Sequence, residues 1–294
     1  MKETVASSEF QVRDPFVLPV PEERRYYLYG TMLTKEERTI GAYFSIELKH
    51  WTGPVVIFRT DGKFWADKDY WAPEVHKYQG KYYMFASFKS DNHCRATQIL
   101  VSEKPLGPFK PLTDKPITPQ EWECLDGTFF VDDAGKPWIV FCHEWLQVSD
   151  GEIWALPLTE DLKEAAGRPV LLFKASDALW TKSVSGSDSH TKDMVTDGPF
   201  VYRTADGTLL MIWSSFGKNG YAMGIAQSES GKIQGPWKQL AKPLFEADGG
   251  HGMLFRDFDG RLICALHKPN VSPNERLNLI PISESGSKLI LPNE

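Results

Sequence analysis

The sequence lacks several features that would point to other classes of protein. It has no long uninterrupted apolar run, so no stretch approaches the length of a membrane span. It has no excess of basic residues, because 33 Lys and Arg stand against 39 Asp and Glu, and the net charge is −6. Such a chain has no electrostatic footprint for nucleic acid or for an anionic membrane. We therefore expect neither among its partners.

The start of the chain also lacks a recognisable targeting signal. Residues 1–10 contain no apolar core of the kind found in signal peptides, and we expect them to form an N-terminal tail. The compartment stays open between the cytoplasm and, after removal of a signal, the periplasm or the exterior. No linker, low-complexity run or change of composition divides the sequence. Residues 1–294 are therefore expected to form a single domain, since all-β folds often reach this length as one unit.

Cysteine is scarce as well, with four residues in the chain. Cys142 and Cys264 lie inside apolar runs, where a buried free thiol is usual. Cys94 and Cys124 lie in connections and are either paired or free. No spacing among the four predicts a zinc site.

Aromatic residues are abundant by contrast, and short apolar runs recur in a regular pattern. Residues 128–131 and 138–142 are two strand-like runs, and residues 132–137 between them are rich in turn formers. This pattern predicts a β-hairpin. The start of its first strand and the end of its second lie at the same end of an antiparallel hairpin. Asp126 and Glu144 are therefore expected to share that end.

Similar hairpins open at four further places, near residues 14, 72, 197 and 250. Additional strand-like runs follow them at residues 41–45, 97–101, 153–156 and 222–226. Five units of four antiparallel strands, roughly fifty residues apart, are typical of an all-β, five-bladed β-propeller. A large β-sandwich is the alternative, and the similar hairpin at the start of each unit argues against it. The innermost strand of a blade is its first, so the opening residues should converge on a central funnel that holds the active site.

The acidic residues that open these strands are the candidate catalytic residues. Asp14, Asp126 and Asp197 each stand at the start of a first strand, and Glu144 follows a second strand. The alternative for an Asp at such a place is a turn cap, and for Glu144 a solvated charge at the rim.

Five other residues are candidate substrate contacts. Trp71 either packs between blades or forms a wall against sugar rings, as aromatic sides do in many concave sites. Trp213 and Phe216 lie near the end of a second strand, and Arg38 is either a ligand contact or a solvated charge in a loop. His251 has glycine on both sides, which suggests that its imidazole points into the funnel to meet substrate or a metal. A purely structural histidine is the alternative.

Five motifs in order, one on each predicted blade, resemble glycoside hydrolase family 43. They are Arg13-Asp14-Pro15-Phe16, Trp71-Ala72-Pro73-Glu74-Val75, Leu125-Asp126-Gly127-Thr128-Phe129, Thr196-Asp197-Gly198-Pro199-Phe200 and Gly250-His251-Gly252. The family consists of five-bladed propellers that cleave arabinosyl, xylosyl or galactosyl linkages, and the resemblance covers nearly the whole chain. It implies a carbohydrate as the partner of this protein. The sequence carries no indication of the oligomeric state.

The resemblance implies an inverting mechanism with three carboxylates. Asp14 is expected to be the general base and Asp126 the residue that tunes and orients the acid. Asp197 stands where the family usually has a Glu as general acid, so Glu144 is a rival for that role. An inverting pair of carboxyl groups is typically about 6.5–9.5 Å apart, which leaves room for water. The resemblance implies no cofactor for the chemistry and a structural cation, such as Ca²⁺, near His251.

Two other classes of protein compete with this interpretation. A carbohydrate-binding propeller without catalysis would keep the aromatic wall and need no trio of carboxylates. A retaining, fructan-type hydrolase usually carries an added β-sandwich, for which the residues after the fifth hairpin leave no room. We therefore expect an inverting hydrolase of arabinosyl or xylosyl linkages.

Overall fold

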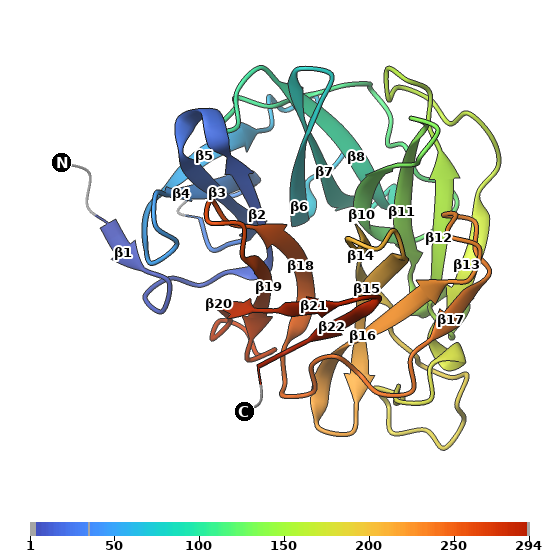
Figure 1. Ribbon diagram of the computed structural model, residues 1–294. Helices are drawn as coiled ribbons and strands as arrows, with labels where there is room; N and C mark the ends of the chain where they lie inside the picture. The colour runs from blue at the N-terminus through green and yellow to red at the C-terminus, as the bar shows by residue number, and fades with distance from the viewer. Residues whose placement is uncertain (1–3, 35, 293–294) are drawn as a thin grey trace.

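Five twisted sheets surround a common axis, as the repeated hairpins predict (Figure 1). The computed structural model describes residues 4–34 and 36–292. The first strands of the sheets, β2, β6, β10, β14 and β18, lie nearest the axis (Figure 1). The ring closes where β18 and β19 pack beside β2. The prediction of an all-β, five-bladed propeller is confirmed.

Each blade is an antiparallel sheet whose neighbouring strands follow one another in the chain, except that β1 joins the first blade beside β5. The first blade contains β1 (Thr4–Ala6), β2 (Arg13–Val20), β3 (Arg25–Thr31), β4 (Thr39–Ser45) and β5 (His50–Arg59). The second contains β6 (Lys68–Tyr78), β7 (Lys81–Ser90), β8 (His93–Ser102) and β9 (Lys110–Pro111), and the third β10 (Cys124–Val131), β11 (Pro137–His143), β12 (Glu152–Pro157) and β13 (Val170–Lys174). The fourth contains β14 (Asp197–Arg203), β15 (Leu209–Gly217), β16 (Gly220–Ser228) and β17 (Trp237–Gln239), and the fifth β18 (Gly250–Arg256), β19 (Leu262–Lys268) and β20 (Arg276–Pro281).

Helical structure is confined to single turns. The described residues contain one short helix, α1 (Trp145–Val148), and two 3₁₀ turns at Pro21–Glu23 and Ala175–Asp177. A separate hairpin, β21 (Ser283–Ser285) with β22 (Lys288–Ile290), follows the fifth blade. Within the described residues, no helix is long and apolar enough to cross a membrane. All four cysteines are free, which decides the open question for Cys94 and Cys124.

Two blades depart from the expected four strands. The fifth has three, and the first has five because Thr4–Ala6, part of the predicted N-terminal tail, pairs with β5. Phe10, also in that segment, is buried and stacks on Tyr43 with ring centroids 4.2 Å apart. The tail prediction is therefore wrong for the described residues from Thr4 onward, because their apolar side chains find partners on the outer side of the first blade.

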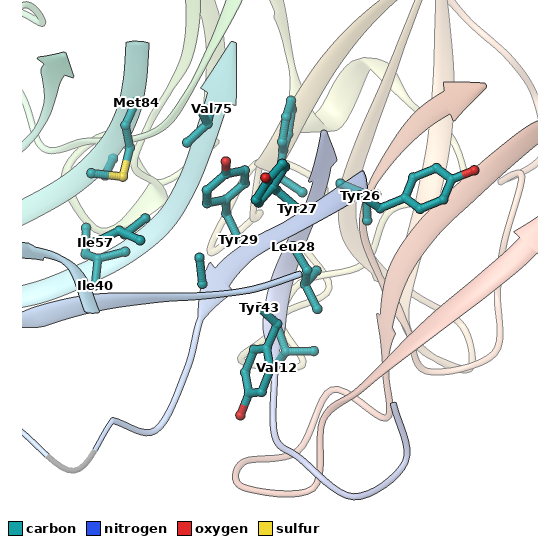
Figure 2. Packing of buried hydrophobic residues seen from close by; sticks show 14 of the residues in the cluster. Val12, Tyr26, Tyr27, Leu28, Tyr29, Ile40, Tyr43, Ile57, Val75 and Met84 are labelled. Carbon is teal, nitrogen blue, oxygen red and sulfur yellow. The ribbon is translucent and has the colours of Figure 1, made fainter. Parts of the chain in front are cut away.

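The core lies between the blades, where each strand alternates its side chains between two neighbours. On β3, Tyr27 and Tyr29 lie on one side and Leu28 on the other (Figure 2). The hydroxyl of Tyr29 donates to the carbonyl of Pro105, in the connection between β8 and β9 of the second blade, at 2.8 Å. Val75 and Met84 lie on the Tyr29 side and are fully buried (Figure 2). This interlocking buries apolar area on both faces of a blade and holds the ring together.

Every innermost strand carries the same irregularity near its start. The pairing with the second strand slips by one residue after Arg13, Trp71, Leu125, Asp197 and Gly250. The next residue in each blade has a positive φ: 54° at Asp14, 44° at Ala72, 56° at Asp126, 48° at Gly198 and 47° at His251. Bulges of this kind re-aim side chains and are common beside active sites.

A side chain of the preceding blade usually accepts a hydrogen bond from the backbone N–H group of this bulge residue. Thr31 Oγ1 accepts from Ala72 at 2.8 Å, Ser87 Oγ from Asp126 at 2.9 Å, and Ser214 Oγ from His251 at 2.8 Å. His267 Nδ1 accepts from Asp14 at 3.2 Å, across the closure of the ring. At the remaining junction, Gly198 donates to Oδ2 of Asp126 at 3.0 Å. These bonds fix each blade to the next at the mouth of the funnel.

Neighbouring serines on β15 allow this arrangement to be tested. Ser214 and Ser215 are both fully buried, but Ser215 Oγ has no hydrogen-bond partner in the described part of the chain. Ser214→Ala leaves the His251 N–H group unpaired, which should lower the free energy of unfolding by about 1–3 kcal/mol. Ser215→Ala should change it by about 0.5 kcal/mol or less. Urea denaturation of the two variants measures the difference, and equal losses would contradict the proposed role of Ser214.

Candidate active site

A cavity of about 420 Å³ opens at the funnel. Its walls bring together six of the predicted site residues, contributed by all five blades: Asp14, Trp71, Asp126, Glu144, Asp197 and His251. Further lining residues include Arg13, Thr31 and Glu275. Convergent polar groups in one concavity are typical of a ligand site.

Asp14 is held from several sides. Its Oδ2 accepts a hydrogen bond from Thr31 Oγ1 at 2.9 Å, and its Oδ1 lies 3.1 Å from Nδ1 of His251. The guanidinium of Arg13 approaches Oδ1 at 3.5 Å and also pairs with Glu275 at 3.4 Å. Burial opposes the charge of Asp14, but His251 and Arg13 outweigh it and hold the pKa of this carboxyl well below its usual range. Asp14 is therefore ionised.

Of the two histidines beside Asp14, one is positively charged and the other is neutral. Burial disfavours a charge on His251, but the carboxylates of Asp14 and Asp126 raise its pKa to about 10. His267 is completely buried, and burial lowers its pKa to about 4. The neutral ring of His267 accepts from the Asp14 N–H group through Nδ1, and its Nε2 lies 3.0 Å from Oδ1 of Asn270. His251 thus supplies charge, whereas His267 fixes the backbone.

Asp126 and Asp197 stand beside each other on β10 and β14. Burial raises the pKa of Asp126, and the charges of Asp197 and Asp14 raise it further against the opposing effect of His251. Burial also raises the pKa of Asp197, although His251 and Arg13 oppose this. Oδ2 of Asp197 accepts a hydrogen bond from the Tyr221 hydroxyl at 2.9 Å. A like-charged neighbour in a buried site favours retention of a proton.

Glu144 follows β11 and is bound by Arg95. The Arg95 guanidinium bonds to Glu144 through Nη1, pairs with Asp69 at 2.9 Å through Nη2, and lies 4.4 Å from the ring centre of Trp71. Burial raises the pKa of Glu144, while Arg95 acts in the opposite direction. Arg95 therefore joins an acidic side chain and an aromatic one into a single wall of the cavity.

The match to known proteins covers nearly the whole chain. The model of glycosyl hydrolases family 43 matches residues 8–281. The chain belongs to this family.

Solved structures and curated proteins are similar to parts or all of the chain. The crystal structure of an endo-arabinase from Bacteroides thetaiotaomicron VPI-5482 is 43% identical, has a TM-score of 0.91, and covers 98% of this chain and 100% of that one. The extracellular endo-alpha-(1->5)-L-arabinanase 1 of Bacillus subtilis (strain 168) is 27% identical over 56% of this chain and 53% of that protein. A xylosidase/arabinosidase of Bacteroides ovatus is 32% identical over 39% of this chain and 40% of its own length. The matched region thus spans about half or less of these curated relatives.

Three predicted contacts of the family 43 site lie outside the cavity. Trp213 is completely buried and packs against Trp180 and Phe173, with ring centroids 5.1 and 5.3 Å away. Its neighbour Ser214 faces the funnel instead, because side chains alternate along β15. Phe216 packs against Tyr221, with ring centroids 5.4 Å apart, and does not line the cavity. These two predictions are therefore wrong.

The prediction for Arg38 is also wrong. Arg38 is exposed and lines a separate surface hollow with Asp67 and Asp91. It belongs to the loop before β4, which directs it to the outer part of the first two blades. The alternative of a solvated loop charge describes it better.

Several residues of the site were not predicted. Arg13 lies in a quoted motif, immediately before Asp14, and its place in a bulge is the signal that could have identified it. Arg95, Tyr221 and His267 lie on second or third strands, far in sequence from the groups they contact. Glu275 reaches the funnel from the loop before β20. No local pattern distinguishes these four residues.

The surroundings of His251 do not form a protein-built metal cage. Ca²⁺ takes six to eight oxygen ligands. Among the described residues, no group of three or more His, Cys, Asp or Glu side chains is arranged to hold a metal ion. Nδ1 of His251 instead faces Asp14 and Asp126, at 3.1 and 3.7 Å. A cation near His251 stays a prediction, and no step below depends on one.

Truncation of two tryptophans should lower the stability of the protein by very different amounts. Trp213→Ala removes a fully buried side chain and should lower the free energy of unfolding by about 3–5 kcal/mol. Trp71 is 38% exposed, so Trp71→Ala should cost about 1 kcal/mol or less, mainly its contact with Arg95. Urea denaturation provides the comparison, and a Trp71→Ala loss as large as that of Trp213→Ala would place Trp71 in the core.

Proposed function

We propose that this protein is an inverting glycoside hydrolase that cleaves arabinosyl linkages inside arabinan chains. The observation that carries the proposal is the convergence of Asp14, Asp126 and Asp197 on one cavity with two cationic partners, Arg13 and His251. Glycoside hydrolysis needs one ionised and one protonated carboxyl on either side of the bond. The environments described above push the pKa values of Asp14 and Asp197 in opposite directions.

The choice of substrate rests on similarity. A solved structure that is 43% identical to this chain over 98% of its length is described as an endo-arabinase. The curated relatives include an endo-arabinanase and a xylosidase/arabinosidase, each matched over part of its length. Arabinosyl units in an internal position of a polymer are therefore the favoured substrate, with xylosyl linkages as the second candidate.

In the proposed mechanism, Asp14 activates a water molecule as general base. Its low pKa keeps it ionised, and Thr31, Arg13 and His251 orient its two oxygens. Asp197 protonates the departing sugar as general acid. Asp126 raises the pKa of the acid through its own charge and donates no proton to the substrate itself.

Asp197 is favoured over Glu144 as the acid because of their contacts. Glu144 is bound to the Arg95 guanidinium, which stabilises its ionised form. Asp197 lies on the innermost strand, immediately before the bulge at Gly198, and lines the cavity together with Asp126. We assign Glu144, with Arg95 and Trp71, to binding the sugar. The exposed part of the Trp71 ring offers a flat apolar surface to the C–H face of a pentose.

An activity screen tests the proposal. Arabinan should be cut into oligosaccharides, whereas xylan and arabinoxylan should react far more slowly. NMR of the first product should show an anomeric configuration opposite to that of the substrate. Asp14→Asn is the matched control, because it should abolish nearly all turnover while sugar binding persists.

Each contrary result of the screen has its own meaning. A retained configuration would indicate the retaining mechanism of the fructan-type hydrolases. Faster cleavage of xylan than of arabinan would make xylosyl linkages the preferred substrate. Oligosaccharide binding without any hydrolysis would support the carbohydrate-binding propeller.

The assignment of the acid predicts a dependence on the leaving group. Asp197→Ala should slow cleavage of natural linkages by about 10²–10⁴-fold, but should spare an aryl glycoside whose leaving group departs without a proton. Since the acid must be protonated, activity of the parent should fall as pH rises through the raised pKa of Asp197, and the variant should lose this alkaline limb.

Glu144→Ala is the comparison for this prediction. It should reduce activity on both kinds of substrate by a similar factor, as expected of a residue that binds sugar. Leaving-group sensitivity in Glu144→Ala and its absence in Asp197→Ala would exchange the two roles.

A further inference from the structure

One blade departs from the pattern of hydrogen bonds at the funnel. In each blade, a residue of the second strand stands opposite the residue that precedes the bulge. These opposite residues are Thr31, Ser87, Cys142, Ser214 and His267, in blade order. Four of them offer an oxygen or nitrogen acceptor to the bulge N–H group of the next blade. The third blade has a cysteine at this position.

A thiol is a poor substitute for these acceptors. Sulfur is a weak hydrogen-bond acceptor, whereas hydroxyl oxygen and neutral imidazole nitrogen are strong ones. Cys142 is completely buried, so no solvent replaces the missing acceptor. The Gly198 N–H group is bound instead by Oδ2 of Asp126, at 3.0 Å.

We propose that Cys142 is a positioning residue: because it offers only a weak acceptor, the Gly198 N–H group is left for Asp126, which is thereby tied to the peptide that carries Asp197. The inference rests on the function proposed for Asp126 and Asp197. It explains why the carboxylate of Asp126 on the first strand, and not a side chain of the second strand, makes the contact between the third and fourth blades.

The contact has two consequences for the carboxylates. It fixes one oxygen of Asp126 against the backbone next to Asp197, so the spacing of the two groups is set by a hydrogen bond between blades. The N–H group also stabilises the charged form of Asp126, which lowers the pKa of that residue against the effect of burial. The other groups that act on Asp126 are His251, Asp14, Asp197 and Tyr221.

The competing explanation is that a cysteine merely fits the apolar interior. Cys142 does pack in a cluster with Leu125, Ile153 and Trp213. If size alone mattered, then any small side chain would serve equally well, whether or not it accepts a hydrogen bond. Acceptor strength and size can be separated by substitution.

The experiment compares Cys142→Ser with Cys142→Ala in the full chain. The introduced hydroxyl should take the Gly198 N–H group at the distances that Ser87 and Ser214 show, 2.9 and 2.8 Å, in a crystal structure of the serine variant. Released from this contact, Asp126 should titrate at higher pH, so the acid limb of the kcat profile should move upward. We expect kcat on arabinan to fall roughly tenfold, as for a lost hydrogen bond to a charged group. Cys142→Ala adds no acceptor and should keep the acid limb of the parent.

Cys264→Ser is the matched control, because it places a hydroxyl in another fully buried position of a second strand. It should leave the pH profile unchanged. The proposal is overturned if the serine variant keeps the Gly198–Asp126 bond, if its acid limb stays in place, or if Cys142→Ala shows the same shift. Absence of hydrolysis by the parent would refute the proposed function alone, since the crystal structure still tests the hydrogen bond.

Discussion

The propeller depends on a ring of backbone N–H groups that each blade offers to its neighbour. Bulge residues with positive φ present these groups, and for a residue other than glycine that conformation costs about 1–2 kcal/mol. Asp14, Ala72, Asp126 and His251 all adopt it. Strain of this kind persists only where the surroundings hold it in place, and it clusters at functional sites. Here the same bulge that links two blades also turns a side chain toward the axis. The contacts that close the ring therefore also position the residues of the site.

The site gathers charges that would repel one another without their partners. Asp14, Asp126 and Asp197 are balanced by Arg13 and by a protonated His251. Arg13 is itself anchored by Glu275, whose carbonyl accepts the Val12 N–H group at the closure of the ring. Because these groups are largely buried, each ion pair acts in a low dielectric, where a small displacement changes pKa values considerably. A rigid scaffold is therefore a requirement of the proposed chemistry as well as of the fold.

The sequence predicts the residues that open the innermost strands and little beyond them. Asp14, Asp126 and His251 reach the cavity as the positive-φ residues of their bulges, whereas Asp197 lines it from the position just before the bulge at Gly198. The turn-rich motifs mark those places. The prediction for Trp213 is wrong because successive side chains on β15 point to opposite faces, so that Ser214 faces the funnel while Trp213 packs in the core. The partners of the carboxylates, such as Arg95 and Tyr221, come from other strands or other blades. Their roles arise from pairing across the ring, which no short stretch of sequence encodes.

The hydrogen bonds between the blades also affect how far Asp197, the proposed general acid, can reach. An Asp is one methylene shorter than the Glu that the family usually has at this position, and a misplacement of about 1 Å can cost about a hundredfold in rate. The side chain of Asp197 cannot extend to compensate, so the backbone must set its reach. That backbone is held through Gly198 by Asp126, and the carboxyl is held by Tyr221. It follows that Asp126 has two tasks in the proposed mechanism. Its charge governs the proton on the acid, and its hydrogen bond governs where the acid stands.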